Sequence, residues 1–245
     1  MKTSNKILIF IGAAFLLSPF INAYSLKHKL NNKEYTLLNI RNKPETELID
    51  IAPTDSIHII GANNLSIEII QSDSTSIEKD KGSDAYVYEK GGLLTVRYAK
   101  DDMNSQHPGV VTIKTPTIKA ISFEGELVEV NTGNKNKTKV TRYYKPYRIL
   151  VKGFKTNQLN IQALNGGVNL TLANNNIDDL SLNIRELSIV QIDSTNHFDL
   201  LNIQSNKNPD ITLDGTHVKS LKTNLGADAS LTLKGNNIES MTSYK

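Results

Sequence analysis

"VNLTLANNNIDDL" (residues 168–180) is the stretch that decides the fold, because its pattern returns twice further along the chain. "DITLDGTHVKSL" (210–221) and "ASLTLKGNNIESM" (229–241) repeat its order: alternating apolar residues, a corner rich in amide or small residues, then two apolar residues three positions apart. Asn and Gly tolerate a left-handed backbone, so each corner is expected to turn the chain sharply.

The apolar positions of these repeats recur with a nearly constant step. One set is separated by 21, 21, 20 and 20 residues: Leu159, Leu180, Leu201, Leu221 and Met241. A second set steps by 20, 21 and 20 residues: Leu172, Ile192, Leu213 and Leu233. A fixed period of about 20 residues is typical of stacked repeats, in which each repeat buries its apolar side only against its neighbours. We therefore predict that equivalent residues lie on neighbouring strands, about 4.8 Å apart.

The preceding part of the chain also reads as strands. Short runs of period-two alternation, such as "IHIIG" (57–61), "LLTVRY" (93–98) and "VVTIKT" (110–115), are separated by turn residues. Leucine-rich repeats share the period, but their consensus asparagine and helix do not recur here in register. The sequence therefore predicts an all-β fold, a right-handed single-stranded β-helix (a β-solenoid of about 20 residues per coil) preceded by an N-terminal apolar helix.

The N-terminus indicates export. Lys2 and Lys6 precede the apolar run "ILIFIGAAFLLSPFINA" (7–23), which ends on the small residue Ala23, as in a secretory signal peptide. Extended to residues 7–26, the segment is also long enough to remain as a membrane anchor. Both alternatives place the rest of the chain in the periplasm or at the cell surface. The predicted domains are a signal peptide or anchor (1–26), a tether with an edge strand (27–54), and a β-helix domain (55–245) with a loop at 132–147.

Composition excludes several classes of site. The 245 residues contain no cysteine, which excludes disulfides and thiolate metal sites, and the net charge is only +3. The densest basic patch consists of Lys135, Lys137, Lys139 and Arg142. It precedes tyrosines that could stack on nucleic-acid bases. Because the charge is otherwise spread along the chain, we interpret this patch as a solvated loop and predict no nucleic-acid partner.

Two longer stretches resemble a known family. "LSIEIIQSDSTSIEKDKGSDAYVYEKGGLLTVRY" (65–98) and "VVTIKTPTIKAISFEGELVEV" (110–130), followed by the Leu- and Asn-rich repeats, resemble the autotransporter-adhesin head GIN domain family of exported Bacteroidetes-type β-helix proteins. The resemblance covers about residues 55–245. It departs from the family at "FEGELVE" (123–129), which keeps only Gly125 of the usual small-residue step. It implies a right-handed β-helix of the cell envelope with no established enzymatic activity.

The positions that alternate with the buried ones carry amides and hydroxyls. Such side chains can bind a sugar or another sheet, but they cannot supply the acid and base of glycoside hydrolysis. Alternatively, they stack into hydrogen-bonded ladders that hold the register. We predict no catalytic residue and no cofactor, and a candidate binding face formed by Asn160, Gln162, Asn183, Asn202, Gln204 and Asn224.

Two corners carry histidines. Stacking of the repeats would place His197 beside His217, with Asp199 on the same side, and this set suits zinc or another divalent ion. The alternative is a surface turn with interchangeable polar residues, which Lys219 in the same column favours. Elsewhere, Glu124 and Glu126 alternate with Gly125 and could form an acid pair, but we favour a solvated strand edge because no base or metal ligand is near in the sequence. His58 is isolated in the sequence, so we expect an ordinary polar position.

The sequence thus favours an exported, non-catalytic protein of the bacterial envelope that binds a protein or glycan partner. A carbohydrate-active β-helix enzyme is the first alternative, although it needs a cluster of charged residues in a groove. A purely structural or signalling accessory, held at the membrane through residues 7–26, is the second.

Overall fold

The computed structural model describes residues 45–61, 65–81, 83, 85–98, 109–125, 127–131, 140–144, 147–186, 188–235 and 238–244. These residues belong to one compact unit, Glu45–Lys245. They form strands and no helix. The strands build two large sheets and one two-stranded sheet, made of β9 (Leu127–Asn131) and β10 (Val140–Tyr144).

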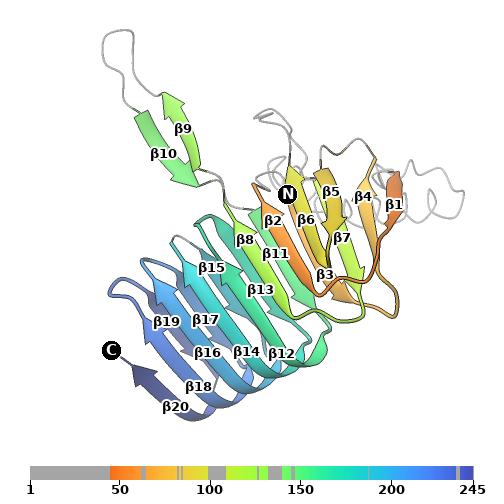
Figure 1. Cartoon of the computed structure of the whole chain (residues 1–245). Helices are drawn as coiled ribbons and strands as arrows, with labels where there is room; N and C mark the ends of the chain where they lie inside the picture. Colours follow the sequence, from red (N-terminus) through yellow and green to blue (C-terminus); the bar gives the residue numbers. More distant parts are fainter. Residues whose placement is uncertain are drawn as a thin grey trace, which may run out of the picture. The chain divides into compact units, whose positions relative to one another are not determined.

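Each large sheet contains nine of the described strands (Figure 1). Sheet A has the spatial order β1 (Thr46–Asp50), β4 (Ser76–Asp80), β7 (Gly109–Thr115), β3 (Leu65–Gln71), β11 (Tyr147–Lys152), β13 (Val168–Ala173), β15 (Ile189–Ile192), β17 (Asp210–Asp214) and β19 (Ser230–Lys234). Sheet B has the order β20 (Ile238–Tyr244), β18 (His217–Leu225), β16 (His197–Asn206), β14 (Asn176–Arg185), β12 (Lys155–Ala163), β8 (Ala120–Glu124), β2 (Ser56–Ile60), β6 (Leu93–Tyr98) and β5 (Ala85–Lys90).

From β11 onward the strands alternate between the two sheets, and all pairs within a sheet are parallel. Leu159 pairs with Leu180, Leu180 with Leu201, and Leu201 with Leu221. All four side chains are fully buried. The predicted register of the repeats is therefore confirmed. Burying each leucine contributes about 1.5–3 kcal/mol, so these inward columns form the core between the sheets.

The short corners between the sheets explain the repeated amide and glycine residues. Asn174 (φ 56°) and Gly215 (φ 68°) adopt the left-handed backbone that the corner requires, as the sequence predicted. The corner before β16 is longer, and there the Asp193 carboxylate accepts a hydrogen bond from the Thr195 amide at 2.9 Å. Each corner thus turns the chain from sheet A to sheet B within a few residues.

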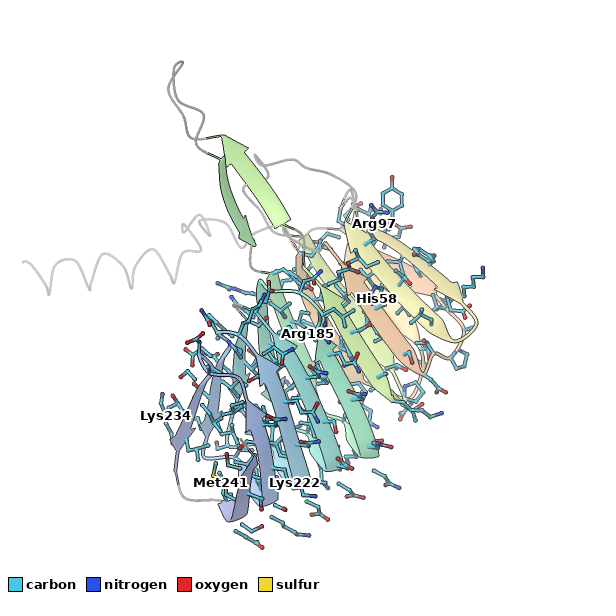
Figure 2. All side chains as sticks on the ribbon, turned by 60° about the vertical axis from the view of Figure 1, so that its left-hand side comes forward. His58, Arg97, Arg185, Lys222, Lys234 and Met241 are labelled. Atoms are coloured by element: carbon cyan, nitrogen blue, oxygen red, sulfur yellow. The ribbon has the colours of Figure 1, made fainter. Side chains whose placement is uncertain are left out.

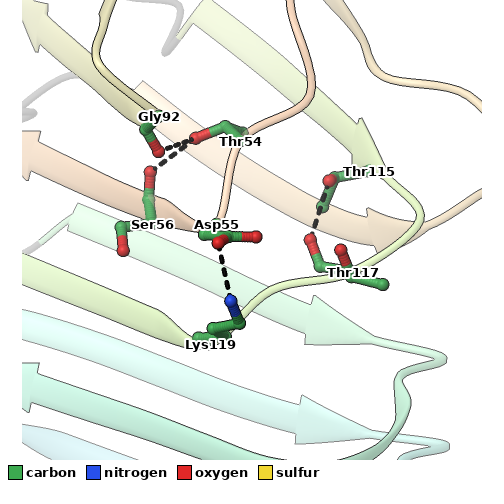
Figure 3. Close-up of polar contacts among 7 residues, drawn as sticks. All are labelled: Thr54, Asp55, Ser56, Gly92, Thr115, Thr117 and Lys119. Atoms are coloured by element: carbon green, nitrogen blue, oxygen red, sulfur yellow. Dashed lines mark hydrogen bonds and ion pairs between the residues drawn. The ribbon is translucent and has the colours of Figure 1, made fainter.

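The N-terminal part of the fold is held by side-chain contacts at its turns (Figure 3). The buried Thr54 hydroxyl lies 2.6 Å from the Gly92 carbonyl oxygen and 2.9 Å from that of Ser56. Lys119 Nζ lies 2.7 Å from Asp55 Oδ2, which ties the start of β8 to the start of β2. These contacts bring strands that are distant in the sequence into adjacent positions of sheet B.

The predicted fold class is wrong beyond its all-β content. The chain does not form a single-stranded right-handed β-helix or solenoid, because both sheets are mixed and the early strands are not in chain order. In sheet B, β2 lies between β8 and β6, and β5 folds back on β6 antiparallel through the left-handed Gly91 and Gly92. A winding that adds one parallel strand per coil cannot produce this order.

The predicted N-terminal helix over residues 1–26 and most of the predicted tether lie outside the described residues. Among the described residues, no helix is long and apolar enough to cross a membrane. The predicted transmembrane anchor at residues 7–26 lies outside the described part. Within the predicted loop at 132–147, the described strand β10 pairs antiparallel with β9. Residues 132–139 and 145–146 lie outside the described part.

Candidate functional site

A row of polar side chains crosses the outer face of sheet B. Because neighbouring strands are paired in register, the residues that point away from the core line up from strand to strand. The row, called here the polar row, runs over β6, β2, β8, β12, β14, β16 and β18 and consists of Thr95, His58, Ser122, Gln162, Asn183, Gln204 and Asn224. At about 4.8 Å per strand it extends roughly 30 Å.

A second row lies two residues earlier on the same strands. Asn160, Ser181, Asn202 and Lys222 are direct partners on β12, β14, β16 and β18. The structure therefore places all six residues of the predicted binding face on one face, in two adjacent rows. Figure 2 labels His58 and Lys222, which lie on different strands of this sheet.

The outward amides do not form the side-chain ladder that the sequence left open as an alternative. In the described part of the chain, none of the six predicted side chains has a hydrogen bond to another side chain or to the backbone. The residues are half-buried or exposed. Their donors and acceptors are thus available to a ligand lying on the face.

Sequence reasoning missed a cluster of three residues at the polar row, formed by His58 and Ser122 of the row and by Glu124, two residues after Ser122 on β8. His58 Nδ1 lies 2.6 Å from Ser122 Oγ, and His58 Nε2 lies 3.7 Å from Glu124 Oε2. His58 and Ser122 are 64 residues apart in the chain, so no local pattern connects them. The expectation that His58 is isolated is therefore wrong.

This cluster contains a nucleophile, a base and a carboxylate, but its surroundings do not suit acyl transfer. Ser122 and His58 lie within β8 and β2, and both strands are paired on both sides. The backbone N–H groups there are engaged in the sheet ladders, so they cannot form the donor pair that stabilises an oxyanion. The cluster extends the polar row and gives it one titratable group.

Two exposed tyrosines lie at one end of the polar row. Tyr88 on β5 is the direct partner of Thr95, and Tyr86 is the partner of Arg97. Their side chains are 54% and 61% exposed, which is unusual for aromatic rings and leaves their faces open to contact. Alternation within "AYVYE" (85–89) places both rings on the outer face, and this was the signal that could have identified them.

The histidine corner is partly as predicted. His197 and His217 pair in register, and their rings stack with centroids 4.9 Å apart and planes inclined by 7°. Asp199 Oδ1 lies 2.6 Å from Lys219 Nζ, and this hydrogen bond, with the charge of Asp199, raises the pKa of Lys219. Among the described residues, no group of three His, Asp or Glu side chains is placed to hold a metal ion. The zinc site stays a prediction, testable by calorimetric titration of the wild type and His197→Ala.

Comparison with known proteins gives similarity at the level of structure alone. No protein-family model and no curated protein matches the chain. A candidate adhesin of Bacteroides fragilis shares 15% identity over 83% of this chain and 98% of its own, with a TM-score of 0.49. A candidate lipid-binding protein of Parabacteroides distasonis shares 15% over 84% and 98% (TM-score 0.40), and a candidate adhesin of that species 13% over 81% and 96% (0.44).

Similarity at this level assigns no ligand and no activity to the chain. Two of the neighbours named are candidate adhesins and one is a candidate lipid-binding protein. Membership of the head GIN domain family stays a prediction, because no family model matches.

Proposed function

We propose that the protein is an exported, non-catalytic binding module that holds a linear glycan on the outer face of sheet B. The observation that carries this proposal is the polar row, whose amides have no hydrogen bond within the described part of the chain. Export is supported by the basic and apolar residues at the N-terminus.

The chemistry of the face favours a glycan over a protein partner. Stable protein interfaces contain a buried core enriched in aromatic and apolar residues, whereas both rows on β12, β14, β16 and β18 contain only amides, a hydroxyl and a lysine. Amides donate and accept, as sugar hydroxyls do, so the two pair without leaving a buried group unsatisfied. The exposed rings of Tyr86 and Tyr88 add aromatic faces on which a sugar ring can lie.

The direction of the row favours a linear polymer. The row runs across the strands for roughly 30 Å, and every side chain in it except the buried Thr95 can contact a ligand that follows it, one per strand. Affinity is therefore expected to rise with the length of the glycan until the row is filled. A compact or branched ligand would use only two or three of these positions.

A screen of neutral linear glycans of increasing length, followed by calorimetric titration of the best binder, tests the proposal. Each lost amide hydrogen bond weakens binding, so replacing Gln162, Asn183 and Gln204 together by alanine should raise Kd at least about tenfold. Thr212→Ala/Thr232→Ala on the outer face of sheet A is the control and should leave Kd unchanged. Equal losses in both variants, or no binding of any glycan in the screen, would contradict the proposal.

The competing enzyme hypothesis predicts turnover instead of binding. It would draw support from release of new reducing ends from any polysaccharide in the screen, abolished by His58→Ala. We expect no release, because glycoside hydrolysis needs a pair of carboxyl groups and the cluster of His58, Ser122 and Glu124 contains one.

A further inference from the structure

The outer face of sheet A contains a hollow that none of the preceding argument uses. It has a volume of about 520 Å³ and lies over β3, β11, β13 and β15. Its polar lining consists of Ser66, Glu68, Arg148, Asn169, Thr171 and Gln191. The hollow exists because the side chains of Ser66, Asn169 and Thr171 are shorter than the side chains around them. This volume falls within the range of small-ligand sites.

Arg148 is the only cation in this lining. It is the direct strand partner of Ser66 on one side and of Asn169 on the other, and its side chain is exposed. It forms no ion pair with any residue that the structure describes. A guanidinium group presents a planar fork of donors that matches a carboxylate with two parallel hydrogen bonds.

Glu68 restricts the kind of anion that fits. It pairs with Leu150, the second residue after Arg148 on β11, so it stands diagonally to Arg148. Diagonal neighbours in a sheet lie about 7–8 Å apart. A polyanion that covered both positions would be repelled by the Glu68 carboxylate. A ligand with a single anionic group at one end and hydroxyl donors at the other satisfies both residues.

Two apolar side chains complete the hollow. Leu150 is half-buried, and Ile189 is 43% exposed at the opposite edge from Ser66. Asn169 is the strand partner of Ile189, and Gln191 lies two residues after Ile189 on β15, so both amides also line the hollow. A sugar ring offers the matching arrangement, because its C–H groups can contact apolar side chains while its hydroxyls reach amides and carboxylates.

We propose that this hollow is a second binding site, for a sugar unit that carries one carboxylate, with Arg148 holding the carboxylate. The carboxylate accepts two hydrogen bonds from the guanidinium, and Glu68 accepts hydrogen bonds from hydroxyls at the far side of the ring. The site lies on sheet A and the polar row on sheet B, so it does not depend on the proposed function.

Two matched probes and two matched variants test the site in the whole chain. The probes are the methyl glycoside of galacturonic acid, which carries one carboxylate, and the methyl ester of the same glycoside, titrated at low salt. Arg148→Gln removes the guanidinium. Lys152→Gln, on the same strand and the same exposed face but outside the hollow, removes an equal charge. Circular dichroism confirms that both variants fold.

We expect the acid to bind and the ester not to bind. Arg148→Gln should raise the Kd of the acid about ten- to a hundredfold, the effect of losing a charge-assisted bidentate pair, while Lys152→Gln leaves it within about twofold. Equal binding of acid and ester, an equal loss in both variants, or no binding of the acid at millimolar concentration would overturn the proposal. The polar-row variant Gln162→Ala/Asn183→Ala/Gln204→Ala should leave this Kd unchanged.

Discussion

Asparagine has two different roles in two regions of this molecule. In the corners, Asn175 and Asn196 point inward and are 1% and 0% exposed. On the outer face of sheet B, amides such as Asn183 and Asn202 face solvent. The corner amides are fully engaged in hydrogen bonds, whereas the face amides have none within the described residues.

The corner amides are structural because they satisfy backbone groups that the turn leaves unpaired. Asn175 Oδ1 accepts a hydrogen bond from the Phe154 amide at 3.0 Å, and its Nδ2 donates to the Val151 carbonyl oxygen at 3.1 Å. Asn175 Nδ2 also lies 2.9 Å from Asn196 Oδ1, which links successive corners into one buried chain of amides. A buried polar group without a partner is costly, so these contacts explain why Asn recurs in the corners.

Asn196→Ala should have the largest effect on stability. Its Nδ2 donates to the Leu172 and Asp193 carbonyl oxygens at 2.8 and 3.0 Å, and its Oδ1 accepts from the amide and side chain of Asn175. Alanine leaves several of these buried groups unpaired, so we expect a loss of about 3 kcal/mol in the free energy of unfolding.

Asn202→Ala is the matched control, since it makes the same chemical change on the outer face. The free energy of unfolding should change by no more than about 0.5 kcal/mol, because the side chain has no hydrogen bond to lose among the described residues. Urea denaturation of both variants measures the difference. Equal midpoints would break the distinction between corner and face amides.

Thr216→Val tests the next corner with a smaller change. Thr216 occupies the position of Asn196 one repeat later, and its hydroxyl lies 2.9 Å from the Ile192 carbonyl oxygen and 3.1 Å from that of Asp193. Valine keeps the shape and removes one donor, so the expected cost is about 1–2 kcal/mol. A larger loss than that of Asn196→Ala would contradict the ranking of the two corners.

The register of the repeats could be predicted from the sequence because it is a periodic property. Leu159, Leu180 and Leu201 recur at a constant step, and only stacking in register buries all of them. The position of the corners could also be predicted, because Asn174 and Gly215 are residue types that tolerate the left-handed backbone conformation found there.

The order of the early strands could not be predicted, since alternation says which face of a strand is buried but not which strand lies next to it. The insertion of β2 between β8 and β6 therefore had no signal in the sequence. For the same reason the contact of His58 with Ser122, and that of Ser66 with Arg148, appeared only in the folded chain. Nor did the corner pattern reveal that Asn175 turns inward.

Tyr147→Phe tests the opposite case, a buried polar group without a partner. The Tyr147 hydroxyl is buried and has no hydrogen-bond partner among the described residues. Burial raises the pKa of Tyr147, with a further contribution from the charge of Glu124. Phenylalanine removes only this hydroxyl, so stability should rise by about 1 kcal/mol. A loss of stability, measured by thermal and urea unfolding, would mean that the hydroxyl has a hydrogen-bond partner, as the buried corner amides do.

The smallest effect is expected for Gln162→Ala/Asn183→Ala/Gln204→Ala on the polar row. The three side chains lie on neighbouring strands but are not joined by hydrogen bonds, so their individual costs should be small and close to additive. We expect the free energy of unfolding to change by less than about 1 kcal/mol.

This variant also decides how a loss of glycan binding is to be interpreted. If binding weakens while the urea midpoint stays close to that of the wild type, the amides act on the ligand rather than on the fold. If the midpoint falls as far as in Asn196→Ala, the face amides support the sheet as the corner amides do, and the comparison between the two regions fails. Both measurements can be made on the same purified protein.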